Sequence, residues 1–106
     1  MDPEVIEKMI DGGRDSYESR LAAGQARLKQ GDLEAAIEHL KKATDHKPDQ
    51  TIAWQELGKA CNEAGQPGQA RMAWQQGLEV AAANGDKQAE KVMTVFLKRL
   101  DRSSPE

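Results

Sequence analysis

The residues of this chain that could do chemistry include two histidines. His39 and His46 lie seven residues apart in a segment whose apolar spacing predicts a helix, so they could share one face of it. A metal site needs further ligands, and no carboxylate or thiolate stands at a spacing that completes one. We therefore expect both histidines to be surface residues, and we expect no metal and no other cofactor.

The single cysteine and the acidic residues could serve covalent or acid–base catalysis. Cys61 falls where a core side chain is expected, and no neighbouring base is apparent that would make its thiol a nucleophile. The 18 acidic residues are scattered over the outer faces of predicted helices. No pair of them has surroundings that would separate two pKa values for acid and base roles. The sequence indicates a protein that is not an enzyme.

Composition and charge limit which other classes of function we expect. The chain has 106 residues, 38% hydrophobic and 31% charged, with a net charge of −3 and both signs mixed along its length. Binding to nucleic acid needs clustered cations, which are missing, and no apolar run approaches the length of a membrane span. A secretory signal peptide begins with basic residues followed by an apolar run, whereas Met1 is followed here by Asp2-Pro3-Glu4, so we expect no signal peptide. We expect one small cytoplasmic domain that binds neither nucleic acid nor membranes.

Four small residues recur at a fixed spacing in the sequence, and this spacing indicates the fold of the chain. Moved by 34 positions with no gap, Gly24, Ala26, Gly31 and Ala36 become Gly58, Ala60, Gly65 and Ala70. Few other residues repeat, so the pattern reflects shared steric needs rather than a recent duplication. A period of 34 is that of a helix-turn-helix unit that stacks into a solenoid.

Apolar spacing and turn residues divide the chain into six helices with no strands. The expected organisation is an N-terminal helix at 3–11, a first repeat at 17–50, a second repeat at 51–84, a last helix at 86–101 and a tail at 102–106. Each repeat would contain two helices, the inner ones at about 16–30 and 50–64. The side chains expected to cap helix N-termini are Asp2, Asp15 or Ser16, Asp32, Asp49 and Asp86.

The two repeats resemble the tetratricopeptide repeat. The second repeat carries the residue types of that pattern at Trp54, Leu57, Gly58, Gly65, Ala70 and Trp74, and the first at Gly24, Gly31, Ala36, Leu40, Ala43 and Pro48. Together the repeats cover about two-thirds of the chain. The resemblance implies an all-α, right-handed helix-turn-helix solenoid of two repeats, with an additional N-terminal helix and a C-terminal helix that solvates the end of the array.

The repeat positions assign packing roles. Gly24 and Gly58 would leave room where two helices approach closely, and Gly31 and Gly65 would allow tight turns. We expect Trp54 and Trp74 to be core residues rather than a binding platform, with Trp54 filling the space where Gly58 and Ala70 converge.

Two arginines depart from the pattern in the first repeat. Arg20 and Arg27 stand where bulky apolar residues are usual. Either the inner side of that repeat is partly solvated, or the arginine stems lie along another helix. The N-terminal helix, with Val5, Ile6, Met9 and Ile10, would be the cover.

The resemblance also implies a binding surface, because the first helix of each repeat lines a concave face. The candidate contact residues are Leu21, Gln25, Leu28, Ile52, Gln55, Lys59 and Asn62. Lys29 and Lys59 would orient a partner, and the apolar residues would anchor it. The alternative for Leu21 and Leu28 is simple contact with the N-terminal helix.

We predict a non-catalytic protein–protein interaction module that binds a peptide or partner protein in its concave groove. Two alternatives involve the C-terminal helix around Val95 and Leu97. This helix could make the protein a structural or oligomerisation element, or a regulatory or assembly subunit of an enzyme. We expect a monomer rather than a dimer.

Overall fold

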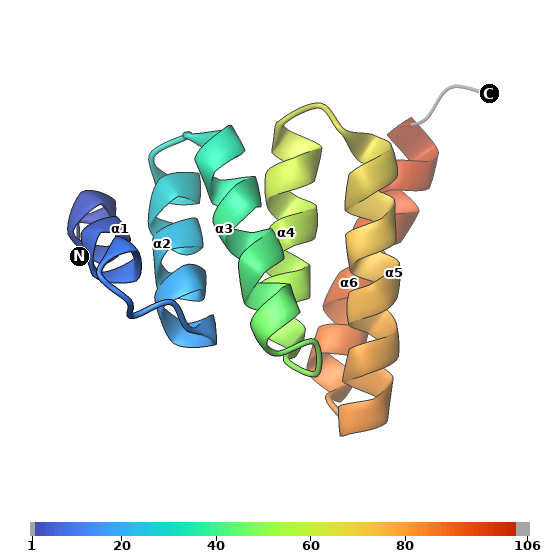
Figure 1. Cartoon of the computed structure of the whole chain (residues 1–106). Coiled ribbons are helices and arrows are strands. Elements are labelled where there is room, and N and C mark those ends of the chain that lie inside the picture. Colours follow the sequence, from blue (N-terminus) through green and yellow to red (C-terminus); the bar gives the residue numbers. More distant parts are fainter. Residues whose placement is uncertain (1, 104–106) are drawn as a thin grey trace.

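Six α-helices and no strand make up residues 2–103, the part of the chain that this computed structural model describes (Figure 1). The helices are α1 (Pro3–Asp11), α2 (Tyr17–Lys29), α3 (Leu33–His46), α4 (Thr51–Glu63), α5 (Pro67–Asn84) and α6 (Lys87–Ser103). The predicted all-α class is confirmed. Helix α6 includes Arg102 and Ser103, which were expected to belong to the tail, and residues 104–106 lie outside the described part. Between residues 2 and 103, no helix combines the length and hydropathy needed to cross a bilayer.

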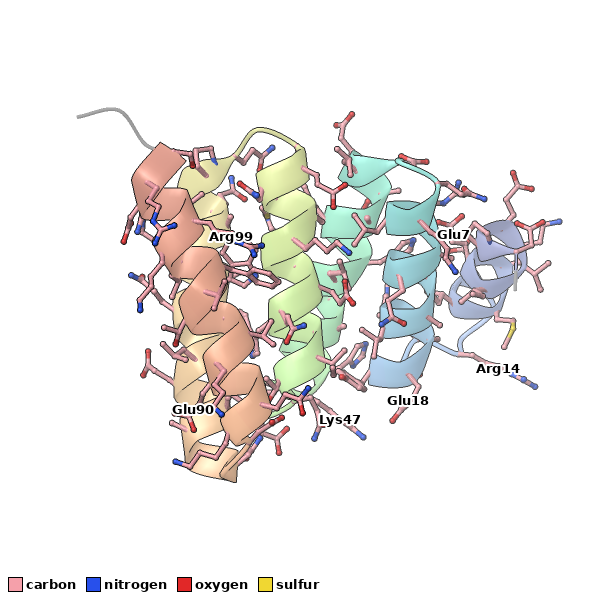
Figure 2. The ribbon with its side chains drawn as sticks, turned by 180° about the vertical axis from the view of Figure 1, so that it is seen from behind. Glu7, Arg14, Glu18, Lys47, Glu90 and Arg99 are labelled. Atoms are coloured by element: carbon pink, nitrogen blue, oxygen red, sulfur yellow. The ribbon has the colours of Figure 1, made fainter. Side chains whose placement is uncertain are left out.

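Helices that are neighbours in the sequence are neighbours in space, so the chain is a solenoid. α2 packs on α3 and α4 on α5 as the two hairpins, while α1 covers α2 and α6 covers α5 (Figure 1). The molecule measures 44 × 30 × 19 Å. Helices α2, α4 and α6 lie on the side that faces the viewer in Figure 2, and α3 and α5 lie on the opposite side. The two sides therefore present different sets of helices to a partner.

Glycines end the first helix of each repeat, as predicted. Gly31 has φ 77° and Gly65 has φ 75°, which lies in the left-handed region that other residues rarely adopt. In both turns the N–H of the residue after the glycine donates to a carbonyl of the last helical turn, from Asp32 to Arg27 and from Gln66 to Cys61. The two hairpins therefore share one turn geometry.

Three of the predicted N-caps are present. The backbone N–H of Glu4 donates to Asp2, and that of Ala89 donates to Asp86 Oδ1 at 3.1 Å. Of the two candidates for α2, Ser16 is the cap, in a reciprocal capping box with Ser19.

The other two predicted caps make no side-chain cap bond, although Asp32 does stand at the N-cap position of α3. Asp32 precedes α3 but its side chain caps no backbone N–H, because its carboxylate instead accepts from Arg27 at 3.3 Å. The residue that precedes α4 is Gln50 rather than Asp49, and it too makes no side-chain cap.

The small residues of the repeat do allow close helix packing. A Cβ added to Gly24 would lie 2.6 Å from Cγ of Leu40, and one added to Gly58 would overlap the indole ring of Trp74. Trp74 is 3% exposed, its indole N–H donates to the carbonyl of Gln55 at 3.1 Å, and its ring lies 4.9 Å from that of Phe96. The indole of Trp74 therefore fills the space that Gly58 leaves.

The expected role of Trp54 is correct only in part, because it packs against the core cluster but does not fill the space beside Gly58. It is half-buried, and its indole N–H donates to the carbonyl of Pro48 at 2.9 Å. Trp54 is on the same helix as Gly58, and helical side chains lean toward the N-terminus of their own helix. Its indole therefore reaches back to the turn at Pro48, and the space beside Gly58 is filled from the partner helix by Trp74.

Candidate protein-binding face

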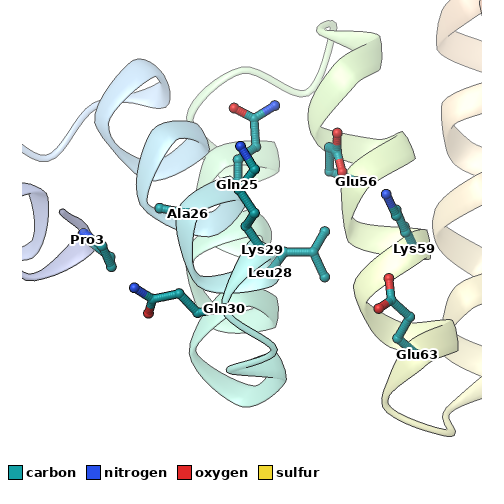
Figure 3. A pocket seen from close by; sticks show the side chains of 9 residues that line it. All are labelled: Pro3, Gln25, Ala26, Leu28, Lys29, Gln30, Glu56, Lys59 and Glu63. Carbon is teal, nitrogen blue, oxygen red and sulfur yellow. The ribbon is translucent and has the colours of Figure 1, made fainter. Parts of the chain in front are cut away.

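A hollow of about 620 Å³ opens between α2 and α4, with Pro3 of α1 at one end (Figure 3). The residues that line it are Pro3, Gln25, Ala26, Leu28, Lys29, Gln30, Glu56, Lys59 and Glu63. Figure 3 shows Leu28 directed from α2 toward α4, where Glu56, Lys59 and Glu63 lie along one edge. The antiparallel hairpins place α2 and α4 on the same side of the solenoid and so create this hollow.

A second hollow of about 370 Å³ lies between α4 and α6. Its lining is Gln55, Glu56, Lys59, Asn62, Glu63, Trp74, Phe96, Arg99, Leu100 and Ser103. Glu56, Lys59 and Glu63 belong to both hollows, because residues three and seven apart share one face of a helix. We call the two hollows together the groove; it runs from α2 across α4 to α6.

Most residues that line the groove have polar side chains, with a few apolar ones among them. Leu28 and Phe96 are the partly buried apolar residues at its two sides. Lys29, Lys59 and Arg99 are exposed, and none of the ion pairs found within residues 2–103 uses them. Their charges are therefore available to a ligand.

Five of the seven predicted contact residues line the groove: Gln25, Leu28, Gln55, Lys59 and Asn62. The other two line neither hollow. Leu21 packs against the buried cluster around Tyr17, and Ile52 is 47% exposed beyond the edge of the hollows. Helix α1 packs on α2 through Ile6, Ile10 and Ala23, and Leu28 packs against the main core cluster.

The contribution of α6 to the groove was not expected from the sequence. Phe96 and Arg99 lie three residues apart on one face of that helix and form the wall of the second hollow. The apolar stripe of α6 predicts that the helix docks, but not that one edge of the stripe faces the groove. Arg99 adds a third cation to Lys29 and Lys59.

Arg27 and Arg20, the two residues that depart from the repeat pattern, belong to a cluster of charged side chains between α1, α2 and α3. Arg27 donates to both oxygens of Glu7, from Nε at 2.9 Å and from Nη2 at 2.6 Å. Glu7 Oε2 also lies 2.7 Å from Nε2 of His39. Of the two alternatives for the arginines, the second therefore holds for Arg27, whose guanidinium pairs with the N-terminal helix.

The expectation that His39 is a surface residue is wrong, since it is 8% exposed under α1. Nη1 of Arg20 lies 3.0 Å from Nδ1 of His39. A guanidinium can only donate, so Nδ1 accepts, and the ring proton is on Nε2, where it is donated to Glu7. His39 thus links Arg20 to Glu7, and the sequence spacing gave no sign of this because the three residues come from three helices.

Arg20 continues the cluster toward the loop before α2. Its Nε and Nη2 donate to the two oxygens of Asp15 at 2.8 and 2.9 Å, and His46 Nε2 lies 2.8 Å from Asp15 Oδ1. The bidentate bonds from Arg20, and then His46, hold the pKa of Asp15 far below its usual range. His46 remains at the surface, as expected, with its side chain 37% exposed.

The cluster predicts a specific loss of stability in acid. The hydrogen bonds from Arg27, and then from His39, lower the pKa of Glu7 from its ordinary 4.5 to about 2. A folded-state pKa below the unfolded value means that Glu7 stabilises the fold above the unfolded pKa, and that this contribution disappears as pH falls from 4.5 toward 2. We expect the melting temperature of Glu7→Gln to be several degrees below wild type at neutral pH and to converge on it in this acid range.

The measurement is thermal unfolding followed by circular dichroism across pH. Glu79→Gln, an exposed acid away from both ends of α5, is the matched control and should stay close to the wild-type curve. A constant difference between Glu7→Gln and wild type from neutral pH to pH 2 would contradict the assignment.

Comparison with known proteins identifies the fold family. A family model of the tetratricopeptide repeat matches residues 21–87. The TPR repeat-containing protein PA0015 of Pseudomonas aeruginosa (strain PAO1) is 48% identical over 100 residues, which are 94% of this chain and 95% of that protein. The solution structure of protein BPP2914 from Bordetella parapertussis is 37% identical, has a TM-score of 0.80, and is matched over 94% of this chain and 87% of its own. The repeat pattern, the helical solenoid and these matches agree, and the chain belongs to the tetratricopeptide repeat family.

Proposed function

We propose that this protein is a non-catalytic binding module that holds a peptide or a segment of a partner protein in the groove between α2, α4 and α6. Tetratricopeptide repeats generally mediate protein–protein interaction. The observation that carries the proposal for this chain is the continuity of the two hollows through Glu56, Lys59 and Glu63, with Leu28 on one side and Phe96 on the other.

The chemistry of the groove supports a peptide ligand. Amide side chains both donate and accept, so Gln25, Gln55 and Asn62 can pair with the main chain of a peptide. Leu28 and Phe96 offer two apolar contacts, and Lys59 lies between them with its charge unpaired. A short peptide held by two modest anchors should bind with a dissociation constant on the order of micromolar.

The surroundings of Cys61 and His39, a potential nucleophile and a potential base, support a non-catalytic role. Burial raises the pKa of the Cys61 thiol, which lowers its thiolate content and its reactivity. His39 has both ring nitrogens engaged by Arg20 and Glu7. A free buried thiol also suits a reducing compartment such as the cytoplasm, where we place the protein.

The test uses peptides selected from a random display library on the wild-type protein, with affinities measured by calorimetry. Lys59→Glu reverses the one positive charge among the three residues that line both hollows, and should weaken binding at least tenfold, about 1.4 kcal/mol. Lys42→Glu, an equally exposed reversal on α3, is the control and should leave affinity within about twofold. Amide shifts should map to α2, α4 and α6. Peptides that bind Lys59→Glu as well as wild type, with shifts on α3 and α5, would contradict the groove.

A further inference from the structure

The face of α5 that points away from the groove is exposed and almost free of charge. Arg71 is the one charged residue among 67–78, in a chain that is 31% charged, and it pairs with Asp101 of α6. The exposed residues of this stretch are Pro67, Gly68, Gln69, Met72, Gln75 and Gln76. Met72 is 70% exposed, more than any other large hydrophobic side chain within residues 2–103. Depletion of charge with an exposed methionine is typical of contact surfaces.

A hollow of about 650 Å³ lies directly beside Met72, between α3 and α5. Its apolar lining includes Leu57, Ala73 and the half-buried ring of Trp54, and its polar residues include Lys41 and Asp45 of α3. Helices α3 and α5 lie on the side opposite to the groove (Figures 1 and 2). A protruding apolar side chain therefore lies next to an apolar hollow on a face that the proposed function does not use.

We propose that a second copy of this chain docks on this face, with Met72 of each copy entering the hollow of the other around a two-fold axis beside α5. A two-fold contact places the same patch on both sides, so it requires a patch that is complementary to itself. A patch of one charge sign would repel its copy, whereas residues 67–78 of α5 carry one charge, that of Arg71, which is paired with Asp101. The exposed acid Glu79 is on the same face as Met72 but lies about two helical turns further along α5.

The polar groups of the patch meet this requirement. Gln69, Gln75 and Gln76 carry amides, each of which donates and accepts and can therefore pair with its own copy. Lys41 and Asp45 have opposite charges and lie one helical turn apart. Lys41 of one copy can therefore face Asp45 of the other copy across the axis. Met72 against Trp54 is a favourable sulfur–aromatic pairing. A partner with a strong charge would find no complement on α5.

The small size of the chain limits the interface area and therefore the affinity of the proposed dimer. A standard interface of about 800 Å² per partner would cover about an eighth of the 6428 Å² surface of this chain. Ordering three exposed glutamines and Met72 opposes association, so we expect a dissociation constant of roughly 10–100 µM. Below that concentration the chain would be a monomer, as expected from the sequence, and the dimer would form only above it. The dimer would leave both grooves open on its outer sides. A partner with two binding segments would then gain affinity through effective concentration.

Sedimentation equilibrium of the full chain from about 5 µM to 1 mM tests the proposal, since this range brackets the expected dissociation constant. Wild type should pass from monomer to dimer, and Met72→Lys should stay monomeric while keeping the wild-type melting temperature, because the side chain is exposed. The matched control is Val95→Lys, which changes a 44% exposed valine on α6 and should dimerise like wild type. On dilution, the indole N–H resonance of Trp54 and the methyl resonance of Met72 should shift.

The other outcomes would overturn the proposal. One is a wild-type protein that remains monomeric at the highest concentration. Another is a Met72→Lys protein that dimerises as wild type does. Loss of dimer in Val95→Lys alone would assign self-association to α6 instead, and concentration-dependent shifts confined to Leu28 and Lys59 would assign it to the groove.

Discussion

Replacing Trp74 by alanine is expected to lower the free energy of unfolding by about 3–5 kcal/mol, the range for a large aromatic residue in a core. The indole is 3% exposed, fills the space beside Gly58 and contacts the ring of Phe96 from α6. Its removal opens a cavity shared by α4, α5 and α6 and removes the indole N–H that donates to the carbonyl of Gln55. A domain of this size has about 5–15 kcal/mol in total, so the variant should be marginally stable.

The measurement is urea unfolding followed by far-ultraviolet circular dichroism, which does not depend on the removed fluorophore. Trp54→Ala is the matched control, because the same side chain is removed from a half-buried site with its indole N–H at the Pro48 turn. We expect a clearly smaller loss for Trp54→Ala. Equal losses, or a larger one for Trp54→Ala, would show that the two tryptophans do not differ in packing as described.

Most of the fold could be predicted because the repeat is a set of local steric requirements. Gly24 and Gly58 mark close approaches, and Gly31 and Gly65 mark turns with positive φ, so residue type at a fixed spacing was sufficient. The caps were less predictable. Asp32 precedes its helix as a cap should, but Arg27 takes its carboxylate, and a competing partner five residues away is not visible in a capping pattern.

The roles of the two tryptophans could not be separated by spacing. Both stand at repeat positions for large aromatic residues, and the pattern predicts that both indoles fill space between the helices of the repeat. Which of them meets Gly58 depends on the direction in which a helical side chain leans, and this sends Trp54 toward Pro48 and leaves the space to Trp74.

The charged cluster was hidden for a different reason. Glu7, Arg27 and His39 are up to 32 residues apart and come from three helices, so no local pattern relates them. The signs of it were Arg20 and Arg27, which stand at positions where bulky apolar residues are usual. The groove is an intermediate case: the repeat register placed five contact residues on α2 and α4, while Phe96 and Arg99 depend on how α6 docks, which the repeat does not specify.

Substitution of Gly58 by alanine should destabilise the fold by about 1–3 kcal/mol, the usual cost of overpacking a core. Alanine is intrinsically the better helix former by about 1 kcal/mol, so the sign of the effect depends on Trp74, whose rigid indole occupies the place of the new methyl group. Gly68→Ala is the control. Nothing lies within 4 Å of a Cβ at Gly68 in α5, and this variant should be neutral or slightly stabilised.

A double-mutant cycle isolates the contact between Gly58 and Trp74. In the Trp74→Ala background the indole is gone, so Gly58→Ala should no longer cost stability, and the helix preference of alanine together with the partly refilled cavity should make it neutral or stabilising. The expected coupling is about 1–3 kcal/mol, within the range for residues in direct contact. Urea unfolding of the four proteins measures it. If the two substitutions add to within about 0.5 kcal/mol, the glycine is not kept small by Trp74, because independent sites add in this way. The recurrence of glycine at this repeat position would then require a backbone explanation rather than the packing one.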